Sequence, residues 1–295
     1  MIDSIIQPSS NDRKASKIII PIAMISVSFA AIFIRFSGSH PISIAFYRMF
    51  FSSIILLIFI PQYLDEIKSI GKKDFIILLT AGLFLAVHFS AWFASLKYTT
   101  VASSVVLVTA HPLIVAWLSS WYLDEKTPRE AIFGIIIAMT GIVIMTFSDY
   151  RIGKLALFGD ILALIGMLAV AGYLIRGREM RRNMSLVPYA FVVYSSCAFF
   201  LAMFSVPFST TFKIYPPQEY VIFFALAIIP TMLGHTLYNW ALKYVKASFV
   251  SVSLISEPVL SSILAFIIFT EVPPILTIIG AAVTLIGIYI CAKNR

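Results

Sequence analysis

The sequence predicts an all-α integral membrane protein whose ten transmembrane helices form two inverted five-helix repeats. The first reason is composition, because 60% of the 295 residues are hydrophobic and only 12% are charged, roughly half the charged share of a soluble domain. The second reason is a succession of long apolar runs, and the third is an internal repeat. A chain of this kind buries its apolar surface in lipid rather than in one aqueous core.

Ten apolar runs are each long enough for a bilayer-crossing helix, which takes about 20 residues. They lie at residues 18–37, 41–61, 75–97, 101–123, 129–148, 155–176, 186–207, 219–243, 247–270 and 274–292. Residues 1–17 form a polar cytoplasmic tail ahead of the first run. No cleavage-site pattern follows that tail, so the first run is expected to be retained as a helix.

The stretch from residue 96 to residue 144 occurs a second time, 146 residues later and without a gap. The matched pairs include Leu96 and Leu242, Lys97 and Lys243, Tyr98 and Tyr244, Pro112 and Pro258, Glu125 and Glu271, Gly134 and Gly280, and Gly141 and Gly287. This self-similarity indicates internal duplication, with a first repeat at 18–148 and a second at 149–295. Because each repeat has an odd number of helices, the two cross the membrane in opposite directions. Many secondary transporters share this plan and bind substrate near the midplane.

The formal net charge of +8 is best explained by membrane topology. If the N-terminus is cytoplasmic, most lysines and arginines fall into cytoplasmic loops, among them Arg176, Arg178, Arg181 and Arg182. This is the bias of the positive-inside rule. The sequence therefore predicts a multi-pass protein of the cytoplasmic membrane with both termini in the cytoplasm, and the charge gives no reason to expect a nucleic-acid partner.

Glu257 and Arg48 are charged residues inside predicted spans. A charge at the bilayer centre costs roughly 2.5–3.5 kcal/mol on insertion scales, so each one needs a reason. Glu257 is either a structural carboxyl bonded to a neighbouring helix or a protonatable, substrate-facing group. Arg48 either snorkels to the interface, pairs with Glu257 or binds a substrate carboxylate. The repeat offset places His111 at the position equivalent to Glu257.

Polar and aromatic side chains on several spans form the predicted substrate site. These residues are Tyr47, Arg48, His88, Trp92, His111, His235, Tyr238, Asn239 and Glu257. An aromatic and imidazole lining suits a flat or cationic solute, although each histidine taken singly also fits a structural role in the core. The histidines do not have the spacing of a zinc motif, so no metal or other cofactor is expected.

Several segments resemble the EamA-domain proteins of the drug/metabolite transporter (DMT) superfamily. The resemblance rests on residues 28–35 (SFAAIFIR), 46–48 (FYR), 88–93 (HFSAWF) and 96–103 (LKYTTVAS), and on Glu257, Pro258 and Glu271 in the second repeat. It extends from about residue 18 to residue 292. It implies a ten-helix fold with a central cavity and the export of amino acids, aromatic ones among them, or of other metabolites. His111 departs from the pattern, because the first repeat lacks the glutamate of the second.

The function expected from the sequence is secondary transport of small metabolites by alternating access, with export of amino acids or related solutes. The chain has no ATP-binding motif, so the energy must come from a gradient, from a partner or from the solute's own concentration difference. Protons are the candidate coupling ion, with Glu257 as their carrier. Membrane lipids are the other expected partners. A lipid flippase or passive pore would share this architecture. A membrane enzyme acting on a lipid-linked substrate is a further alternative, but the sequence lacks a phosphate loop and paired acids.

Overall fold

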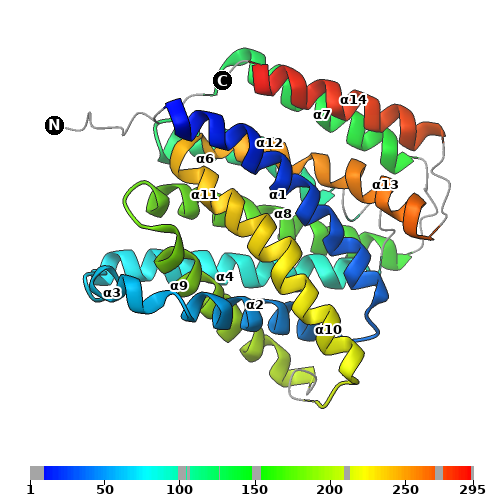
Figure 1. The fold of residues 1–295 in the computed structure, drawn as a ribbon. Coiled ribbons are helices and arrows are strands. Elements are labelled where there is room, and N and C mark those ends of the chain that lie inside the picture. Colours follow the sequence, from blue (N-terminus) through cyan, green and yellow to red (C-terminus); the bar gives the residue numbers. More distant parts are fainter. Residues whose placement is uncertain are drawn as a thin grey trace.

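A computed structural model describes residues 10–98, 104, 107–125, 127–147, 154–208, 213–269 and 275–293 as a helical bundle (Figure 1). Its helices are α1 (Ser10–Phe36), α2 (Pro41–Leu57), η1 (Ile60–Tyr63), α3 (Leu64–Lys68), α4 (Lys72–Ser95), α6 (His111–Tyr122), α7 (Arg129–Phe147), α8 (Lys154–Arg181), α9 (Leu186–Ser205), η2 (Val206–Phe208), α10 (Pro217–Leu226), η3 (Ala227–His235), α11 (Thr236–Tyr244), α12 (Ala247–Leu254), α13 (Ser256–Phe269) and α14 (Ile275–Lys293).

Within the described residues, six helical segments are long and apolar enough to cross a membrane. They are Ile18–Phe36, Lys72–Ser95, Phe158–Arg181, Leu186–Phe208, Pro217–Tyr244 and Ala247–Ile268, and the bent pair Pro41–Leu57 and Ile60–Lys68 counts as a seventh when taken as one span. These segments make the chain a multi-pass membrane protein. The predicted spans at 101–123, 129–148 and 274–292 lie partly outside the described residues, so the count of ten stays a prediction.

Several predicted helix boundaries differ from the observed ones. Helix α1 begins at Ser10, inside the predicted polar tail, and α8 continues to Arg181, five residues beyond the predicted end at 176. In both places charged residues extend the helix beyond its apolar run. Hydropathy locates the part of a helix that lies in lipid, whereas the helical backbone continues into the interface.

Prolines divide two of the predicted spans. The run at 41–61 ends as a helix at Leu57, where the chain bends by 67° into η1 and α3, and the run at 247–270 breaks after Leu254 into α12 and α13. In each case a proline, Pro61 or Pro258, stands four residues beyond the break. A proline cannot donate to the carbonyl four residues earlier, and its ring clashes with that carbonyl.

Pro230 acts in the same way on the predicted span at 219–243. This span begins as α10, which ends at Leu226, continues as the π-helical segment η3 and resumes α-helical geometry as α11. Pro230 again stands four residues beyond the end of the regular helix. The Thr231 hydroxyl donates to the Leu226 carbonyl over 2.9 Å, so a side chain adds a hydrogen bond to the backbone at the point where the π-helical segment begins.

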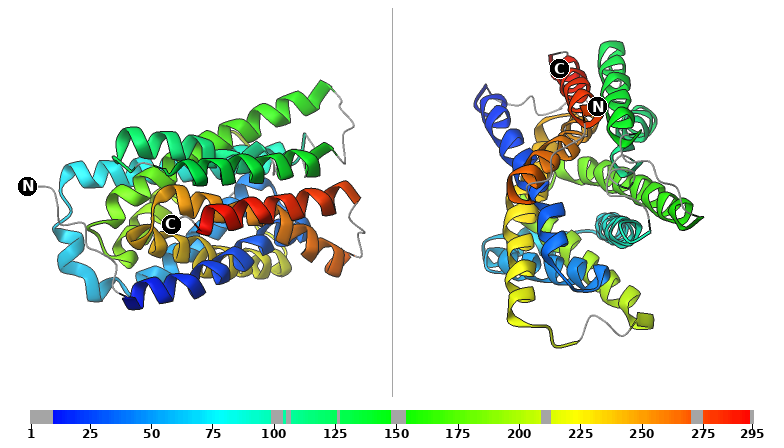
Figure 2. Two further views of the ribbon diagram at one scale, coloured as in Figure 1. Left: turned by 90° about the horizontal axis from the view of Figure 1, so that it is seen from above. Right: turned by 90° about the vertical axis from the view of Figure 1, so that its right-hand side faces the viewer.

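The helices of the two predicted repeats pack against each other rather than forming separate bundles. Helix α4 packs against α8 and α9, while α1 packs against η3, α11 and α13. Figure 1 shows α1 running beside the α10–η3–α11 span, and Figure 2 shows the elongated bundle from two further directions. The central part of the protein is therefore built from both halves of the sequence.

Helices α7 and α14 form a closely packed pair at one edge of the bundle (Figures 1 and 2). A Cβ atom built on Gly141 would lie only 2.5 Å from the Gly280 oxygen, and one built on Gly287 would meet the Gly134 oxygen at 2.6 Å. The hydroxyl of Thr284 on α14 lies 3.4 Å from the Ala138 carbonyl oxygen of α7. These glycines allow the two backbones to approach closely, which is the packing role that the sequence predicts.

Candidate functional site

A small cavity lies in the interior of the bundle, where helices from both halves of the chain meet. It has a volume of about 30 Å³ and is lined by Val27, Ala30, Arg48, His88, Trp92, Val108, Thr109, His111, Val170, His235, Leu254 and Glu257. These residues include a cation, an anion and three histidines. The structure thus brings together six residues of the predicted site from α2, α4, α6, η3 and α13.

Arg48 is 1% exposed and held from two directions. Its Nε atom donates to the Thr231 hydroxyl over 2.7 Å, and its guanidinium carbon lies 4.7 Å from the centre of the Phe89 ring. The Nη2 atom is buried and has no hydrogen-bond partner among the described residues. Snorkelling is therefore excluded for Arg48, because its guanidinium is fixed in the interior.

Glu257 lies in the first turn of α13, directly before Pro258. The neighbouring hydroxyls do not hold its carboxyl group: Ser261 donates to the Glu257 backbone oxygen over 2.7 Å, and Ser253 donates to carbonyls of its own helix. Glu257 and Arg48 interact electrostatically across the cavity region. Between these two described residues no direct ion pair forms, so both charges remain available to a solute.

His88 and Trp92 form one wall of the cavity on α4. Their rings stack at 5.7 Å with an interplanar angle of 21°. The His88 Nδ1 atom lies 3.0 Å from the Gly166 carbonyl oxygen, and because a carbonyl only accepts, Nδ1 carries the proton. The Nε2 atom of the neutral ring is therefore a hydrogen-bond acceptor. Trp92 contributes a donor, since its buried Nε1 atom has no partner within the described part of the chain.

His111 and His235 line the same cavity from other helices. The Nδ1 atom of His111 lies 2.6 Å from the Ser251 hydroxyl on α12, which links α6 to the second half of the chain. The His235 ring meets Phe89 edge-on at 5.8 Å. Among the described residues, no three His, Cys, Asp or Glu side chains are close enough to hold a metal ion. The contacts of these two imidazoles are hydrogen bonding and ring packing.

Three residues of the predicted site lie outside the cavity. Tyr47 stacks on Phe223 at 4.9 Å, nearer one end of the bundle. Asn239 accepts from Tyr173 over 2.8 Å and donates to Tyr194 over 3.1 Å. Tyr238 is fully buried and lies within electrostatic range of Glu257. A direct role of these three residues in binding stays a prediction.

Thr231 contacts the candidate site through Arg48, and it was not among the residues predicted from the sequence. It joins the Leu226 carbonyl to Arg48 through two hydrogen bonds. A single threonine in an apolar span does not by itself indicate a functional site. Its position directly after Pro230 was the available signal. A proline frees a carbonyl four residues earlier, and a hydroxyl next to the proline is well placed to bond it.

At one end of the bundle, Glu219 at the start of α10 forms a hydrogen-bonded cluster that we call the Glu219 cluster. The carboxylate accepts from the Gly38 backbone over 2.8 Å, from the Ser39 hydroxyl over 2.8 Å and from the Ser37 hydroxyl. It therefore joins the α1–α2 turn to α10. The donors in these three bonds are uncharged.

At the opposite end, Glu125 forms a cluster with two arginines that we call the Glu125 cluster. One Glu125 oxygen accepts from Arg178 over 2.7 Å and from Arg182 over 2.6 Å. Arg178 also donates to the carbonyls of Leu242 and Lys243 at the end of α11. Since α10, η3 and α11 form one span from Pro217 to Tyr244, the two clusters lie at opposite ends of the bundle.

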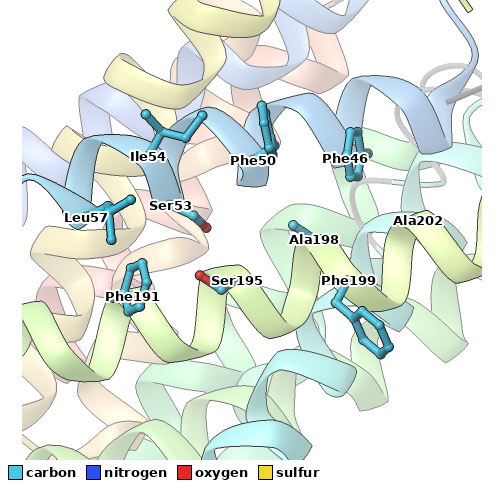
Figure 3. A pocket seen from close by; sticks show the side chains of 10 residues that line it. All are labelled: Phe46, Phe50, Ser53, Ile54, Leu57, Phe191, Ser195, Ala198, Phe199 and Ala202. Carbon is cyan, nitrogen blue, oxygen red and sulfur yellow. The ribbon is translucent and has the colours of Figure 1, made fainter. Parts of the chain in front are cut away.

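A larger hollow lies between α2 and α9, with a volume of about 370 Å³ (Figure 3). It is lined by Phe46, Phe50, Ser53, Ile54, Leu57, Phe191, Ser195, Ala198, Phe199 and Ala202. Figure 3 shows the two serine hydroxyls facing each other across an otherwise apolar groove. No charged group lines it, so it suits hydrocarbon and does not suit a polar metabolite.

A model of the EamA-like transporter family matches residues 16–147 and again residues 157–292. Over 282 residues the chain is 25% identical to an "Uncharacterized transporter" of Archaeoglobus fulgidus, covering 91% of this chain and 93% of the relative. Over 267 residues it is 26% identical to an "S-adenosylmethionine uptake transporter" of Rickettsia prowazekii, covering 89% of this chain and 87% of the relative.

One solved crystal structure has the same fold. It superposes with a TM-score of 0.80 at 16% sequence identity, covering 95% of this chain and 97% of the other. At that identity the likeness concerns the path of the backbone. It shows that the arrangement of helices around the cavity is one that a known protein adopts.

Proposed function

Because the chain belongs to the EamA-like transporter family, we propose that it is a secondary transporter that moves amino acids or related small metabolites by alternating access. The resemblance seen in the sequence to EamA proteins of the DMT superfamily is confirmed by the double family match. Relatives named as transporters support transport as the general activity. The substrate class, the direction and the coupling ion are the proposed parts.

The buried charges at the cavity are the observation that carries this proposal. Arg48 and Glu257 come from helices in the two halves of the chain and line the same small cavity. Charges inside a membrane are costly, rare and mark substrate or ion pathways. A structural role for Glu257 would require a partner for its carboxyl group, and none is present among the described residues.

The closed state of the cavity supports a carrier rather than a pore. A volume of about 30 Å³ admits a few water molecules at most, whereas small-molecule sites typically measure roughly 300–1,000 Å³. The Glu125 and Glu219 clusters join helices at the two ends of the bundle. In the proposed cycle a solute enters when the helices move apart at one end, which is the principle of alternating access.

The proposed architecture is two inverted repeats of five helices, at 18–148 and 149–295, in the cytoplasmic membrane with both termini in the cytoplasm. The two family matches and the distribution of basic residues support it. With this orientation the Glu125 cluster is cytoplasmic and the Glu219 cluster faces outward. We propose export with protons as the coupling ion and Glu257 as the proton carrier; since the Rickettsia relative is named for uptake, both directions need testing.

Transport by the purified protein in proteoliposomes tests this function. Labelled amino acids and S-adenosylmethionine are measured in both directions, with and without a pH gradient. We expect saturable transport that unlabelled solute inhibits, and loss of its pH dependence in Glu257→Gln. Glu130→Gln is the matched control, because Glu130 is exposed in the first turn of α7.

Other outcomes separate the alternatives. Flux that does not saturate would indicate a pore, and movement of labelled lipids alone would indicate a flippase. Unchanged transport and pH dependence in Glu257→Gln would rule out Glu257 as the proton carrier.

A further inference from the structure

Next to the proline in the middle of one span, the Thr231 hydroxyl oxygen is a hydrogen-bond acceptor for Arg48. Pro230 has no N–H group, and the regular helix ends at Leu226, four residues before it. The backbone continues with π-helical geometry over Ala227–His235, and π-helical segments are frequent at functional sites. The Thr231 hydroxyl donates its only proton to the Leu226 carbonyl over 2.9 Å.

The bond to Leu226 determines how Thr231 meets Arg48. A hydroxyl that has donated its proton can only accept further bonds, and Thr231 accepts from the Arg48 Nε atom over 2.7 Å. The Phe89 ring lies against one face of the guanidinium at 4.7 Å. Arg48 is thereby fixed by one edge and one face, although it sits on a different helix from Thr231.

One further donor of the guanidinium, the Nη2 atom, has no hydrogen-bond partner within the described residues that would explain its burial. Arg48 is 1% exposed and Trp92 is 4% exposed, and both line the cavity. The Arg48 Nη2 atom and the Trp92 Nε1 atom are both buried donors with no acceptor within the described residues. Native proteins rarely leave such donors unsatisfied, so this wall of the cavity is prepared for a ligand that accepts hydrogen bonds.

The charges of the cavity narrow the class of ligand. A guanidinium edge matches the geometry of a carboxylate or a phosphate. Glu257 lines the same cavity, and a doubly charged phosphate would be repelled by it. A molecule with one carboxylate and one cationic group adds no net charge and can pair with both Arg48 and Glu257. The His88 Nε2 atom is a further acceptor for an ammonium group.

We infer that Arg48 and Trp92 form a carboxylate-binding subsite, that Thr231 is the positioning residue of Arg48, and that the solutes are zwitterions with their cationic group toward Glu257. This inference rests on the proposed transport function and deepens it by naming the recognised groups. Amino acids and S-adenosylmethionine both carry the required carboxylate and cation.

The test uses pairs of solutes that differ only at the carboxylate. Unlabelled L-phenylalanine, L-phenylalaninamide and 2-phenylethylamine compete with labelled L-phenylalanine in proteoliposomes, and S-adenosylmethionine competes with its decarboxylated analogue in the same assay with labelled S-adenosylmethionine. For the wild type we expect each carboxylate to compete at least about tenfold better than its partner, as the loss of a charge-assisted bond predicts.

Variants of Thr231 then distinguish an effect on the position of Arg48 from a general effect on folding. Thr231→Val keeps the shape of the side chain but removes both hydrogen bonds, and it should reduce the carboxylate preference to a few-fold. Thr231→Ser keeps the hydroxyl and should restore the preference. Thr140→Val is the matched control, because Thr140 bonds only the Ile136 carbonyl of its own helix, at an exposed position.

A second variant covers the case in which Thr231→Val does not fold. Trp92→Phe retains an aromatic ring beside His88 and removes the N–H donor, and it should lower the preference in the same direction.

The outcomes distinguish this inference from the transport proposal. Transport in which the amide and the amine compete as well as the acid would overturn the carboxylate subsite while leaving transport intact. A preference that survives in both Thr231→Val and Trp92→Phe would overturn the assigned residues. If the wild type moves none of these solutes in either direction, the transport proposal fails, and this inference fails with it.

Discussion

One carboxylate joins helices at each end of the bundle, but the two carboxylates have different partners. In the Glu125 cluster a carboxylate oxygen faces two arginines, and one of them, Arg178, has a side chain that is only 10% exposed. In the Glu219 cluster the carboxylate meets two serine hydroxyls and a backbone N–H. In the Glu125 cluster the carboxylate is paired with positive charges. In the Glu219 cluster the negative charge is stabilised only by neutral hydrogen-bond donors.

The comparison shows that the two ends of this bundle are not chemically equivalent. Removing the carboxylate at one end leaves a buried cation without a counter-charge, while removing it at the other leaves only neutral donors that water can satisfy. In the proposed alternating-access cycle, the free-energy cost of separating the helices should therefore be lower at the Glu219 end than at the Glu125 end.

The largest effect is expected from Glu125→Gln. It leaves the buried Arg178 guanidinium unpaired, and loss of one partner of a buried pair typically costs about 3–5 kcal/mol. Thermal unfolding in detergent should show a large fall in stability. Arg182→Ala at the same carboxylate should cost less than about 1 kcal/mol, because its side chain is 41% exposed and exposed pairs contribute little. Equal losses in the two variants would contradict the assigned difference in burial.

A smaller effect is expected from Glu219→Gln. The amide oxygen still accepts hydrogen bonds, and the loss of the charge should cost at most roughly 1.5–3 kcal/mol, the value of hydrogen bonds to charged groups. The same unfolding assay measures it beside Glu125→Gln. A loss as large as that of Glu125→Gln would mean that the Glu219 end also balances a buried cation.

The smallest effect concerns pH at the Glu219 end. Burial, followed by the nearby charges of Lys97 and Lys213, lowers the pKa of His40 below its ordinary value. The unfolded chain therefore binds a proton more readily, so stability is fully present above about pH 6.5, the ordinary pKa of histidine, and declines as the pH falls below it. His40→Asn retains a capping side chain for α2 and should weaken this decline in unfolding scans between about pH 7 and pH 5. An unchanged decline would assign it to other groups.

Much of the fold follows from simple rules applied to the sequence, and the exceptions have definite causes. Hydropathy located the spans because lipid requires apolar runs, but a window average does not detect a single proline. The breaks at Leu57, Leu226 and Leu254 each lie four residues before a proline. The positions of these three breaks could therefore have been predicted from the prolines in the sequence. The 67° bend after α2 also depends on packing.

The charged residues of the candidate site were predictable from the sequence, because a charge inside a membrane is costly. Arg48 and Glu257 were identified because a membrane interior penalises both. Tyr47 was included as the neighbour of Arg48, but successive residues on a helix point about 100° apart, and only Arg48 lines the cavity. Thr231 was missed because an uncharged hydroxyl carries no such penalty, and its role arises from Pro230 and from a helix far away in the sequence.

The opposite charges of Arg48 and Glu257 bear on how the membrane voltage acts on the carrier. With both groups ionised, the pair has no net charge, and a zwitterionic solute adds none. The membrane voltage therefore does no work on the pair, with or without bound solute, when access changes from one face to the other. Protonation of Glu257 changes this by one elementary charge, worth about 2.3 kcal/mol per 100 mV if it crosses the whole field. In the proposed mechanism, the ionisation of Glu257 thus decides whether transport is electrogenic.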